Sequence, residues 1–153
     1  MTSRRWDNFS IWRGRLPHWR ADNVSYYVIF RHRRDLDEAE RSKLLFNLKK
    51  ADGKKWDLVI ACVLPAQTEL IFRVAEGNEL SDIVEKAKKR TGKDIIKKSG
   101  EKWPPFFDES YDHIIRDDAE FEEFWTKILD SPVDLELVNE PGDYPELYVA
   151  DAP

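Results

Sequence analysis

The pattern of hydrophobic and polar positions predicts four strands along the chain. Residues 24–31 (VSYYVIFR) form a β-branched and aromatic run of strand length. Residues 56–64 hardly alternate between apolar and polar, which predicts a strand buried on both faces. After a break at Pro65-Ala66, residues 68–74 predict the second arm of a tight β-hairpin, and residues 111–116 (YDHIIR) predict a short fourth strand.

Two helices are predicted between these strands. Asp37 is suited to cap the first helix, which ends at Asp52-Gly53 and carries three leucines on its apolar side: Leu44, Leu45 and Leu48. The second helix follows Gly77-Asn78 and has an apolar stripe at helical spacing: Leu80, Ile83, Val84 and Ala87. Outside that stripe it carries mostly Lys and Arg, so one flank of this helix is basic.

A third helix is predicted after the fourth strand. Asp117 and Glu120 have the spacing of a capping box. Large apolar residues then recur at i, i+3, i+4, i+7 and i+8, namely Phe121, Phe124, Trp125, Ile128 and Leu129. Pro132 is predicted to end the helix. Lys127 and Ser131 are four residues apart, so we expect them side by side on the helix edge away from the apolar stripe.

The β-hairpin also carries a pair of polar residues. Residues two apart in a strand share a face, so Gln67 and Glu69 project from one face and Leu70, Phe72 and Val74 from the other. Such a pair, delivered by a tight hairpin off a buried strand, is a candidate catalytic platform. It is equally a common way to solvate an ordinary hairpin.

The order of the predicted elements indicates an α+β fold. Strand, helix, strand, strand, helix, strand, helix suggests an antiparallel sheet with helices packed on one face, in a ferredoxin-like sandwich. RNA-binding sheets of this topology need exposed aromatic residues on the central strands, which the third strand lacks. With 153 residues, 41% of them hydrophobic, the chain can bury one core. We expect one domain over residues 21–153, with an acidic C-terminal tail, and an N-terminal arm over residues 1–20.

Composition adds expectations about location and cysteine chemistry. No apolar run approaches the length of a membrane span, and the first twenty residues are rich in Arg and Trp, so we expect a soluble, cytoplasmic protein without a membrane partner. Cys62 is the single cysteine and lies within the apolar run, which predicts a buried structural thiol. No Cys and His cluster has the spacing of a zinc site.

The charge is unevenly distributed, although the net charge is only -5. Residues 1–34 and 84–102 are basic, whereas residues 108–153 are strongly acidic. Arg interleaved with Trp in the arm suits phosphate contact and base stacking, or else an arm whose indoles pack on its own domain. If the protein binds nucleic acid, we expect these residues to contribute: Arg13, Arg15, Arg20, Lys86, Lys89, Arg90, Lys93, His113 and Arg116.

Four segments support a resemblance to a known family. They are RLPHWRADNVSYYVIFR, ACVLPAQTELIF, ESYDHIIRDDAEFEEFW and KILDSPVDLELVNEPGDYP, and together they span Arg15 to Pro145. In order and spacing they resemble the small single-tyrosine HUH transposases, especially the REP-associated tyrosine transposases. The resemblance implies an HUH fold, single-stranded or hairpin DNA as partner, and a chain that acts as a monomer or a homodimer in DNA transposition.

The resemblance also implies where the chemistry would lie. In that family the β-hairpin reads roughly MPNHVHLL, and its two histidines bind a divalent metal; those positions fall on Gln67 and Glu69. The nucleophilic tyrosine and an amide ligand four residues later fall on Lys127 and Ser131. All four residues depart from the family pattern. A protonated lysine cannot form a phosphotyrosine link, so the departure predicts loss of cleavage.

We therefore expect a catalytically inactive, transposase-like DNA-binding protein that needs no cofactor, a domesticated or decaying relative of these enzymes. An ion pair between Glu69 and Lys127 is expected in preference to a weak Mg²⁺ or Mn²⁺ site at Glu69. One alternative is an active metal-dependent transposase or nickase that uses a substitute tyrosine, with Tyr111 the nearest candidate. Another is a protein-interaction module whose acidic C-terminal surface meets a basic partner.

Overall fold

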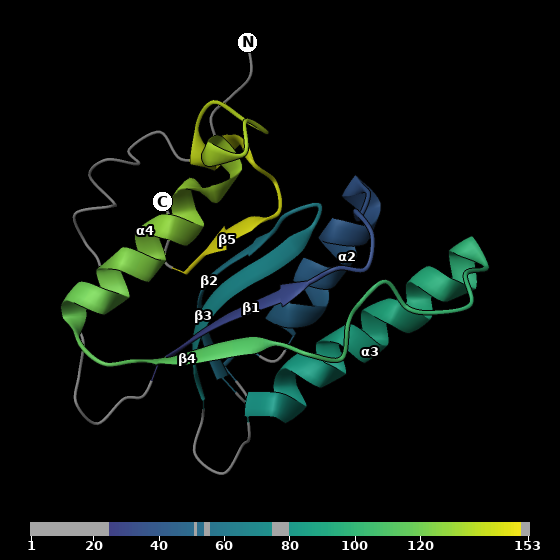
Figure 1. The fold of residues 1–153 in the computed structure, drawn as a ribbon, viewed down its shortest axis with the longest axis horizontal. Coiled ribbons are helices and arrows are strands. Elements are labelled where there is room, and N and C mark those ends of the chain that lie inside the picture. Colours follow the sequence, from purple (N-terminus) through teal and green to yellow (C-terminus); the bar gives the residue numbers. More distant parts are fainter. Residues whose placement is uncertain (1–24, 51, 54–55, 75–79, 151–153) are drawn as a thin grey trace.

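A computed structural model describes residues 25–50, 52–53, 56–74 and 80–150. The N-terminal arm lies outside this range, and with it Arg13, Arg15 and Arg20. The described residues form one antiparallel sheet with the order β4-β1-β3-β2-β5 (Figure 1). The strands are β1 (Ser25–Arg31), β2 (Trp56–Val63), β3 (Gln67–Val74), β4 (Tyr111–Ile115) and β5 (Leu147–Val149). The helices are α2 (Glu38–Lys49), α3 (Leu80–Ser99) and α4 (Asp118–Asp134), followed by the 3₁₀ turn η1 (Pro141–Asp143).

The first six elements form the ferredoxin-like part of the fold. They run β1, α2, β2, β3, α3, β4, with the strands in the order 4-1-3-2. Helices α2 and α3 cover one face of the sheet, where Val28 and Phe72 pack with Leu44, Leu48 and Val84. The predicted α+β class is thus confirmed. Asp37 caps α2 as expected, and Asp37 and Glu40 form a reciprocal capping box.

Helix α4 lies on the opposite face of the sheet, across from α2 and α3 (Figure 1). Phe121, Trp125 and Ile128 of α4 pack there against Ile60 of β2 and Ile71 of β3. The expectation that the helices share one face is therefore wrong for α4. The reason lies in β2, which is apolar in both directions and needs cover on both sides.

The C-terminal segment contributes a strand that the sequence pattern did not reveal. Leu147 of β5 pairs with Cys62 and Val149 pairs with Ile60, so β5 closes the outer edge of β2. Tyr144 is buried and its hydroxyl donates to the Val63 carbonyl at 2.7 Å. Part of the expected acidic tail is therefore built into the sheet and the core.

Helix α4 also runs past its proline. Pro132 removes one backbone donor, yet the helix extends to Asp134, and the Leu135 N–H bonds the Ser131 carbonyl at 3.0 Å. A single lost hydrogen bond near the C-terminus therefore does not stop the helix. Across the described ranges, no helix has the length and apolarity that a bilayer crossing requires.

Candidate functional site

The β-hairpin between β2 and β3 is anchored by His32. Its ring lies 2.8 Å from the Pro65 carbonyl through Nδ1 and 2.8 Å from Thr68 Oγ1 through Nε2. A carbonyl only accepts, so Nδ1 carries the proton and Thr68 donates to Nε2. Burial lowers the pKa of His32 to about 4, so the ring is neutral near pH 7. His32 thereby fixes the turn that precedes Glu69.

Glu69 is buried on the α4 side of the sheet with three polar neighbours. Ser131 Oγ lies 2.6 Å from Glu69 Oε2, and the same hydroxyl lies 2.7 Å from the Lys127 carbonyl. The Tyr27 hydroxyl and the Gln67 amide approach Glu69 Oε1 at 3.4 and 3.3 Å. The structure therefore brings together Gln67, Glu69 and Ser131, which sequence analysis had singled out. We call Tyr27, Gln67, Glu69 and Ser131 the Glu69 cluster.

The position of Ser131 corrects one expectation. Ser131 is 8% exposed and faces the sheet, whereas it was predicted on the helix edge away from the apolar stripe. It follows Ile128 by three residues, so it continues the buried stripe beyond the last large apolar side chain. Because serine is small and polar, the hydrophobic pattern of the sequence does not predict that Ser131 is buried.

The expected ion pair between Glu69 and Lys127 is not formed. Lys127 is exposed, and its Nζ lies over the ring of Tyr27, 5.7 Å from the centroid. Glu69 is 2% exposed and lies beneath α4. To pair with Glu69, the Lys127 ammonium would have to leave water. This desolvation costs more free energy than keeping the ammonium at the surface in a cation–π contact with Tyr27.

Tyr27 is the member of the Glu69 cluster that sequence reasoning missed. Its ring stacks on Phe124 at 4.3 Å between centroids, and its pKa is raised by burial and, secondarily, by the Glu69 carboxylate. The phenol therefore stays protonated and donates toward Glu69. Adjacent residues of a strand point to opposite faces, so either Tyr26 or Tyr27 lies on the face that carries Glu69. Which of the two lies beside Glu69 and α4 depends on the face that α4 covers, and the local sequence does not show this.

Tyr111 lies farther from Glu69. It heads the edge strand β4 and pairs with Ile29, which in turn pairs with Glu69, so one strand separates them. Its side chain is 60% exposed. His113, two residues on, contacts Glu120 Oε1 through Nε2 at 2.7 Å, which joins β4 to the first turn of α4. Arg116 is exposed after the end of β4.

The Glu69 cluster does not suit a divalent cation. In the described part of the chain, no group of three His, Cys, Asp or Glu side chains is arranged to hold a metal ion. Both oxygens of Glu69 already face donors, from Ser131 on one side and from Tyr27 and Gln67 on the other. Cys62 is buried nearby, and its burial raises the pKa of the thiol, as a structural cysteine requires.

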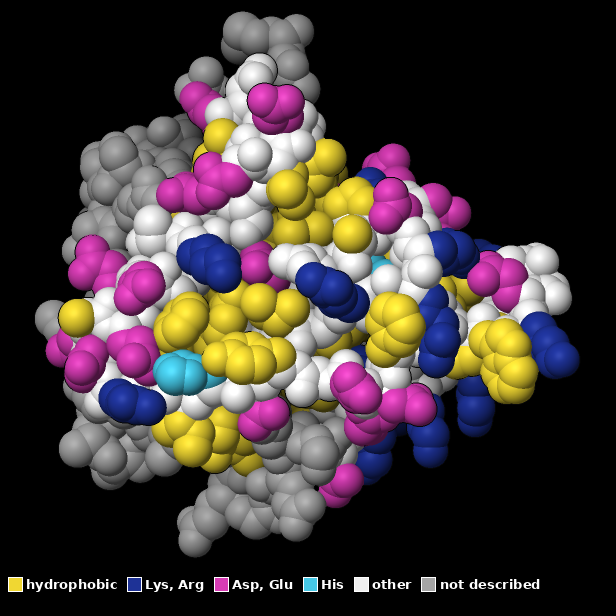
Figure 2. Space-filling model, viewed as in Figure 1, with side chains coloured by type: hydrophobic (Ala, Val, Ile, Leu, Met, Phe, Trp, Pro, Cys, Tyr) yellow, Lys and Arg dark blue, Asp and Glu magenta, His cyan; other side chains and the backbone are white. Residues whose placement is uncertain are grey.

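The predicted basic residues of α3 lie on its outer face. Lys86, Lys89, Arg90 and Lys93 are all exposed, and Lys97 continues the same row; we call these five residues the α3 stripe. None of the five forms an ion pair with another described residue. Figure 2 shows Lys and Arg side chains gathered where Figure 1 places α3. Two of the three acidic residues of this helix have partners outside the stripe: Asp94 with Lys43 at 3.3 Å and Glu85 with Lys88 at 3.5 Å.

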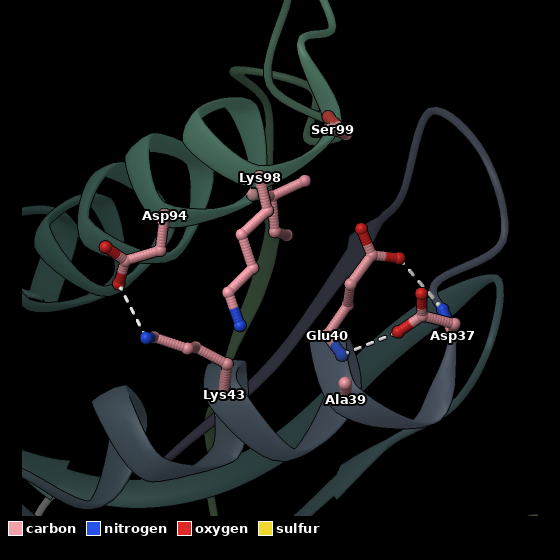
Figure 3. A pocket seen from close by; sticks show the side chains of 8 residues that line it. Asp37, Ala39, Glu40, Lys43, Asp94, Lys98 and Ser99 are labelled. Carbon is pink, nitrogen blue, oxygen red and sulfur yellow. Dashed lines mark hydrogen bonds and ion pairs between the residues drawn. The ribbon is translucent and has the colours of Figure 1, made fainter.

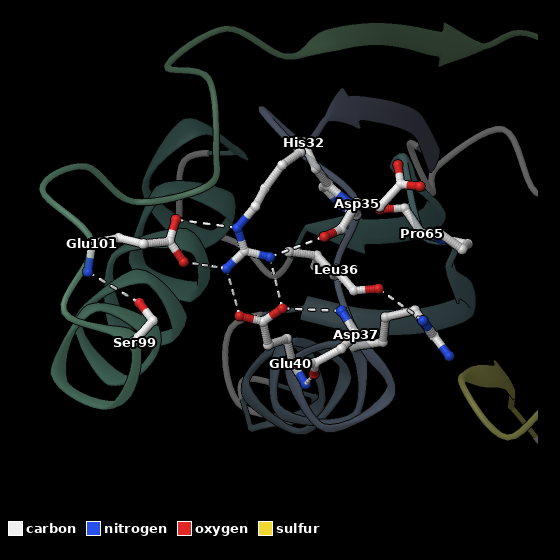
Figure 4. A network of polar contacts seen from close by, with 10 residues as sticks. His32, Asp35, Leu36, Asp37, Glu40, Pro65, Ser99 and Glu101 are labelled. Atoms are coloured by element: carbon white, nitrogen blue, oxygen red, sulfur yellow. Dashed lines mark hydrogen bonds and ion pairs between the residues drawn. The ribbon is translucent and has the colours of Figure 1, made fainter.

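A charge network ties the loop after β1 to the loop after α3 (Figure 4). Arg34 forms an ion pair with Glu40 of α2 at 2.6 Å and another with Glu101 at 2.5 Å. The guanidinium lowers the pKa of both carboxyl groups. Because one cation is shared by two loops and a helix, the network positions backbone segments rather than a ligand.

A cavity of about 270 Å³ lies between α2 and α3 (Figure 3). Asp94 and Lys43 face each other across it, while Glu40 and Asp37 are engaged in the capping box at the other end. Lys98 points into the space. Most of the charged side chains that line this cavity thus already have partners. The cavity is therefore a poor candidate site for an ionic ligand.

Comparison with solved structures identifies the architecture. The chain superimposes with a TM-score of 0.64 on a REP-associated tyrosine transposase bound to a REP hairpin, over 86% of this chain and 82% of the other, at 16% identity. The chain has the fold of a tyrosine transposase. A presumed transposase from Deinococcus radiodurans R1 also matches, with a TM-score of 0.45 and 14% identity over 76% of this chain and 97% of the other. No family model and no curated protein matches the sequence.

Within this transposase fold, the four positions singled out by the resemblance converge. Gln67 and Glu69 on β3 face α4, where Ser131 contacts Glu69 and Lys127 lies one turn earlier. What the arrangement can do chemically is limited: it offers a buried carboxylate, two hydroxyls, an amide and a surface ammonium. It holds neither an exposed phenol nor a set of metal ligands.

Proposed function

We propose that the protein binds single-stranded or hairpin DNA and does not cleave it. The observation that carries the binding part is the α3 stripe. Lys86, Arg90, Lys93 and Lys97 follow one another at spacings of four, three and four residues, with Lys89 alongside. Eleven residues of helix span about 16 Å, over which a nucleic-acid backbone presents several phosphates.

The Glu69 cluster supports the absence of cleavage. A covalent phosphoryl transfer needs a nucleophile that can reach the phosphorus and a cation or donor that stabilises its charge. Tyr27 contacts Glu69 but is buried beneath Phe124, and its raised pKa keeps it a phenol. Tyr111 is exposed but one strand away from Glu69. Neither tyrosine combines access with activation.

The fold supports DNA as the partner. The similar transposase was solved with a REP hairpin, and this chain shares its fold over most of its length. We infer that the present protein retains a nucleic-acid partner while its catalytic positions have diverged. The acidic residues of α4 lie away from the α3 stripe, because α4 covers the other face of the sheet.

Fluorescence anisotropy with labelled single-stranded and hairpin DNA tests the binding. The double reversal Lys89→Glu/Arg90→Glu is expected to weaken binding at least tenfold and to flatten the dependence on salt. The matched control is Lys49→Glu/Lys50→Glu, which makes the same charge change at the end of α2. Absence of binding by the unmodified protein at low salt would overturn the proposal and favour the interaction module.

Incubation of the same DNAs with Mg²⁺ or Mn²⁺ tests the second part. We expect no covalent protein–DNA adduct on a denaturing gel. An adduct that disappears in Tyr111→Phe or Tyr27→Phe would instead establish an active enzyme with a substitute nucleophile.

A further inference from the structure

A second cavity opens where β1 ends beside the start of β4. Its volume is about 380 Å³, within the range of small-ligand sites. Its lining consists of Ile29, Phe30, Arg31, Phe107, Glu109, Ser110 and Tyr111. Tyr111 and Phe107 are 60% and 39% exposed, which is unusual for large aromatic side chains. None of the lining residues belongs to the Glu69 cluster.

The chemistry of the walls is that of a nucleotide site. Tyr111 offers an exposed ring on the rigid end of a strand, and aromatic rings are the usual platforms for unpaired bases. Arg31 is exposed at the end of β1 and forms no ion pair with another described residue, so its guanidinium is free to meet a phosphate. Glu109 and Ser110 add hydrogen-bonding groups at another wall.

The segment that carries Phe107 and Ser110 is fixed by contacts with Lys88 of α3 and with Arg33. The Lys88 ammonium, which is buried, lies 3.0 Å from the Phe107 carbonyl and 3.0 Å from Ser110 Oγ. Arg33 lies over the Phe107 ring, 4.7 Å from its centroid, and Arg33 Nε donates to the Phe106 carbonyl at 3.1 Å. A wall fixed in this way loses little freedom when a ligand binds.

We propose that this cavity binds one unpaired base of a single DNA strand, stacked on Tyr111, with Arg31 on an adjacent phosphate. The inference rests on the proposed function and specifies which residues contact the base and the phosphate of the bound strand. The Glu109 carboxylate repels phosphate, so the backbone lies on the Arg31 side and the base edge meets Glu109. A carboxylate accepts from an exocyclic amino group, which cytosine, adenine and guanine have and thymine lacks, so these three bases bind more tightly than thymine.

Oligonucleotides containing one 2-aminopurine test the stacking. Binding to the unmodified protein is expected to quench the fluorescence of 2-aminopurine. Tyr111→Ala is expected to remove the quenching and to weaken binding about tenfold, since stacking of a base on an aromatic ring is worth roughly 1–3 kcal/mol. Tyr111→Phe keeps the ring and is expected to bind normally. Trp103→Ala removes another exposed aromatic residue, outside the cavity, and serves as the matched control.

The phosphate contact and the base preference have separate readouts. Arg31→Ala is expected to lower the slope of log K against log salt by about 0.7, the value for one phosphate on a single strand. Oligo(dC) and oligo(dA) are expected to bind more tightly than oligo(dT), and Glu109→Gln to reduce that difference. Equal binding by dCMP alone and by the oligonucleotide would overturn the assignment to a strand and indicate a mononucleotide site.

The outcomes separate this inference from the proposed function. If the Lys89→Glu/Arg90→Glu protein loses DNA while Tyr111→Ala retains both affinity and quenching, the base site is wrong and DNA binding stands. If the unmodified protein binds no single-stranded DNA, both fail. Circular dichroism of Tyr111→Ala and of Tyr111→Phe verifies that β4 is intact in each comparison.

Discussion

His32 illustrates how one buried side chain can hold a turn and also sense pH. Its neutral ring accepts from Thr68 and donates to Pro65, and a second proton on Nε2 removes the acceptor for the Thr68 hydroxyl while the bond to Pro65 persists. The pKa falls from an ordinary 6.5 to about 4 in the folded protein. The unfolded chain therefore binds this proton at a higher pH than the folded one does.

The free energy of unfolding is thus expected to fall as the pH drops from about 6.5 to about 4, by up to about 3 kcal/mol from this group. Below pH 4 both states are protonated and this contribution stays constant. Urea unfolding at pH 7.0, 5.5 and 4.5 measures the loss. His32→Gln, which cannot titrate, should be less stable at pH 7 and lack this part of the slope; an unchanged slope in the variant would contradict the assignment.

Ser131 provides a second test at a single side chain. Ser131→Ala leaves Glu69 Oε2 buried without the hydroxyl that lies 2.6 Å away. We expect a destabilisation of about 1–3 kcal/mol, the usual cost of an unsatisfied buried polar group. Ser42→Ala, at an exposed position of α2, is the control and should change stability little. Chemical denaturation of the two variants compares them directly; equal stability would mean that the Ser131 hydroxyl contributes nothing at Glu69.

Individual residues also mark the limit of prediction at the candidate site. The prediction that Gln67 and Glu69 share a face opposite to Leu70 and Phe72 is confirmed, because strand alternation is strict. Ser131, 62 residues from Glu69, was connected to it only through the family resemblance, and Tyr27, 42 residues away, was missed, because neither differs locally from a helical serine or a core tyrosine. Long-range packing of α4 against β1 and β3 decides both contacts.

Among the helices, α3 joins the two surfaces proposed to meet DNA. Its exposed side carries the α3 stripe, while Lys88 on its inner side binds the carbonyls of Phe107 and Glu109 and the Ser110 hydroxyl. Burial lowers the pKa of Lys88, and the nearby carboxylates of Glu85 and Asp108 oppose that shift. The segment before β4 therefore takes three of its contacts from one ammonium, in addition to those made by Arg33.

Lys88→Met keeps most of the side-chain volume but removes the charge. We expect faster amide hydrogen exchange in residues 107–111, because the carbonyls there lose their donor, and a lower free energy of unfolding by about 1–3 kcal/mol. Lys89→Met changes the neighbouring exposed residue and should leave exchange in this segment unchanged. If the two variants exchange alike, Lys88 does not hold the segment.

The helices and the first four strands were predictable because each carries a strong local signal. Asp37 and Asp117 both cap helices as their spacing indicated, and the strand predicted over residues 56–64 is formed as β2, Trp56–Val63, and is buried along most of its length. β5 was missed because three residues after a proline-containing segment give too short a pattern. β5 forms by pairing with the outer edge of β2, and a local sequence pattern cannot show that this edge is available for pairing.

Across the molecule, the basic residues of α3 and the acidic residues of α4 lie on opposite sides of the sheet. The α3 stripe lies on the side of α2 and α3, while the acidic residues of α4 lie on the other side. Bound DNA is therefore expected to shield the α3 stripe more than the acidic surface of α4. Such an arrangement also orients the approach of a polyanion before contact.

Lysine acetylation with and without DNA measures this directly by mass spectrometry. We expect protection of the four lysines of the α3 stripe, Lys86, Lys89, Lys93 and Lys97, and unchanged reaction at Lys49 and Lys50. Protection spread evenly over all lysines would contradict a DNA interface at the α3 stripe. The experiment needs no substitution, so it is independent of any effect of variants on folding.

The two apolar clusters, one on each face of the sheet, also bear on biosynthesis. The cluster under α2 and α3 is drawn from Val28 to Phe106, whereas the cluster under α4 needs residues as late as Val149. A ribosome-bound chain that has emerged as far as β4 can assemble the first cluster while Ile60, Cys62 and Ile71 still lack their cover. The nascent protein is thus expected to present a bare apolar sheet face to chaperones until α4 and β5 have emerged.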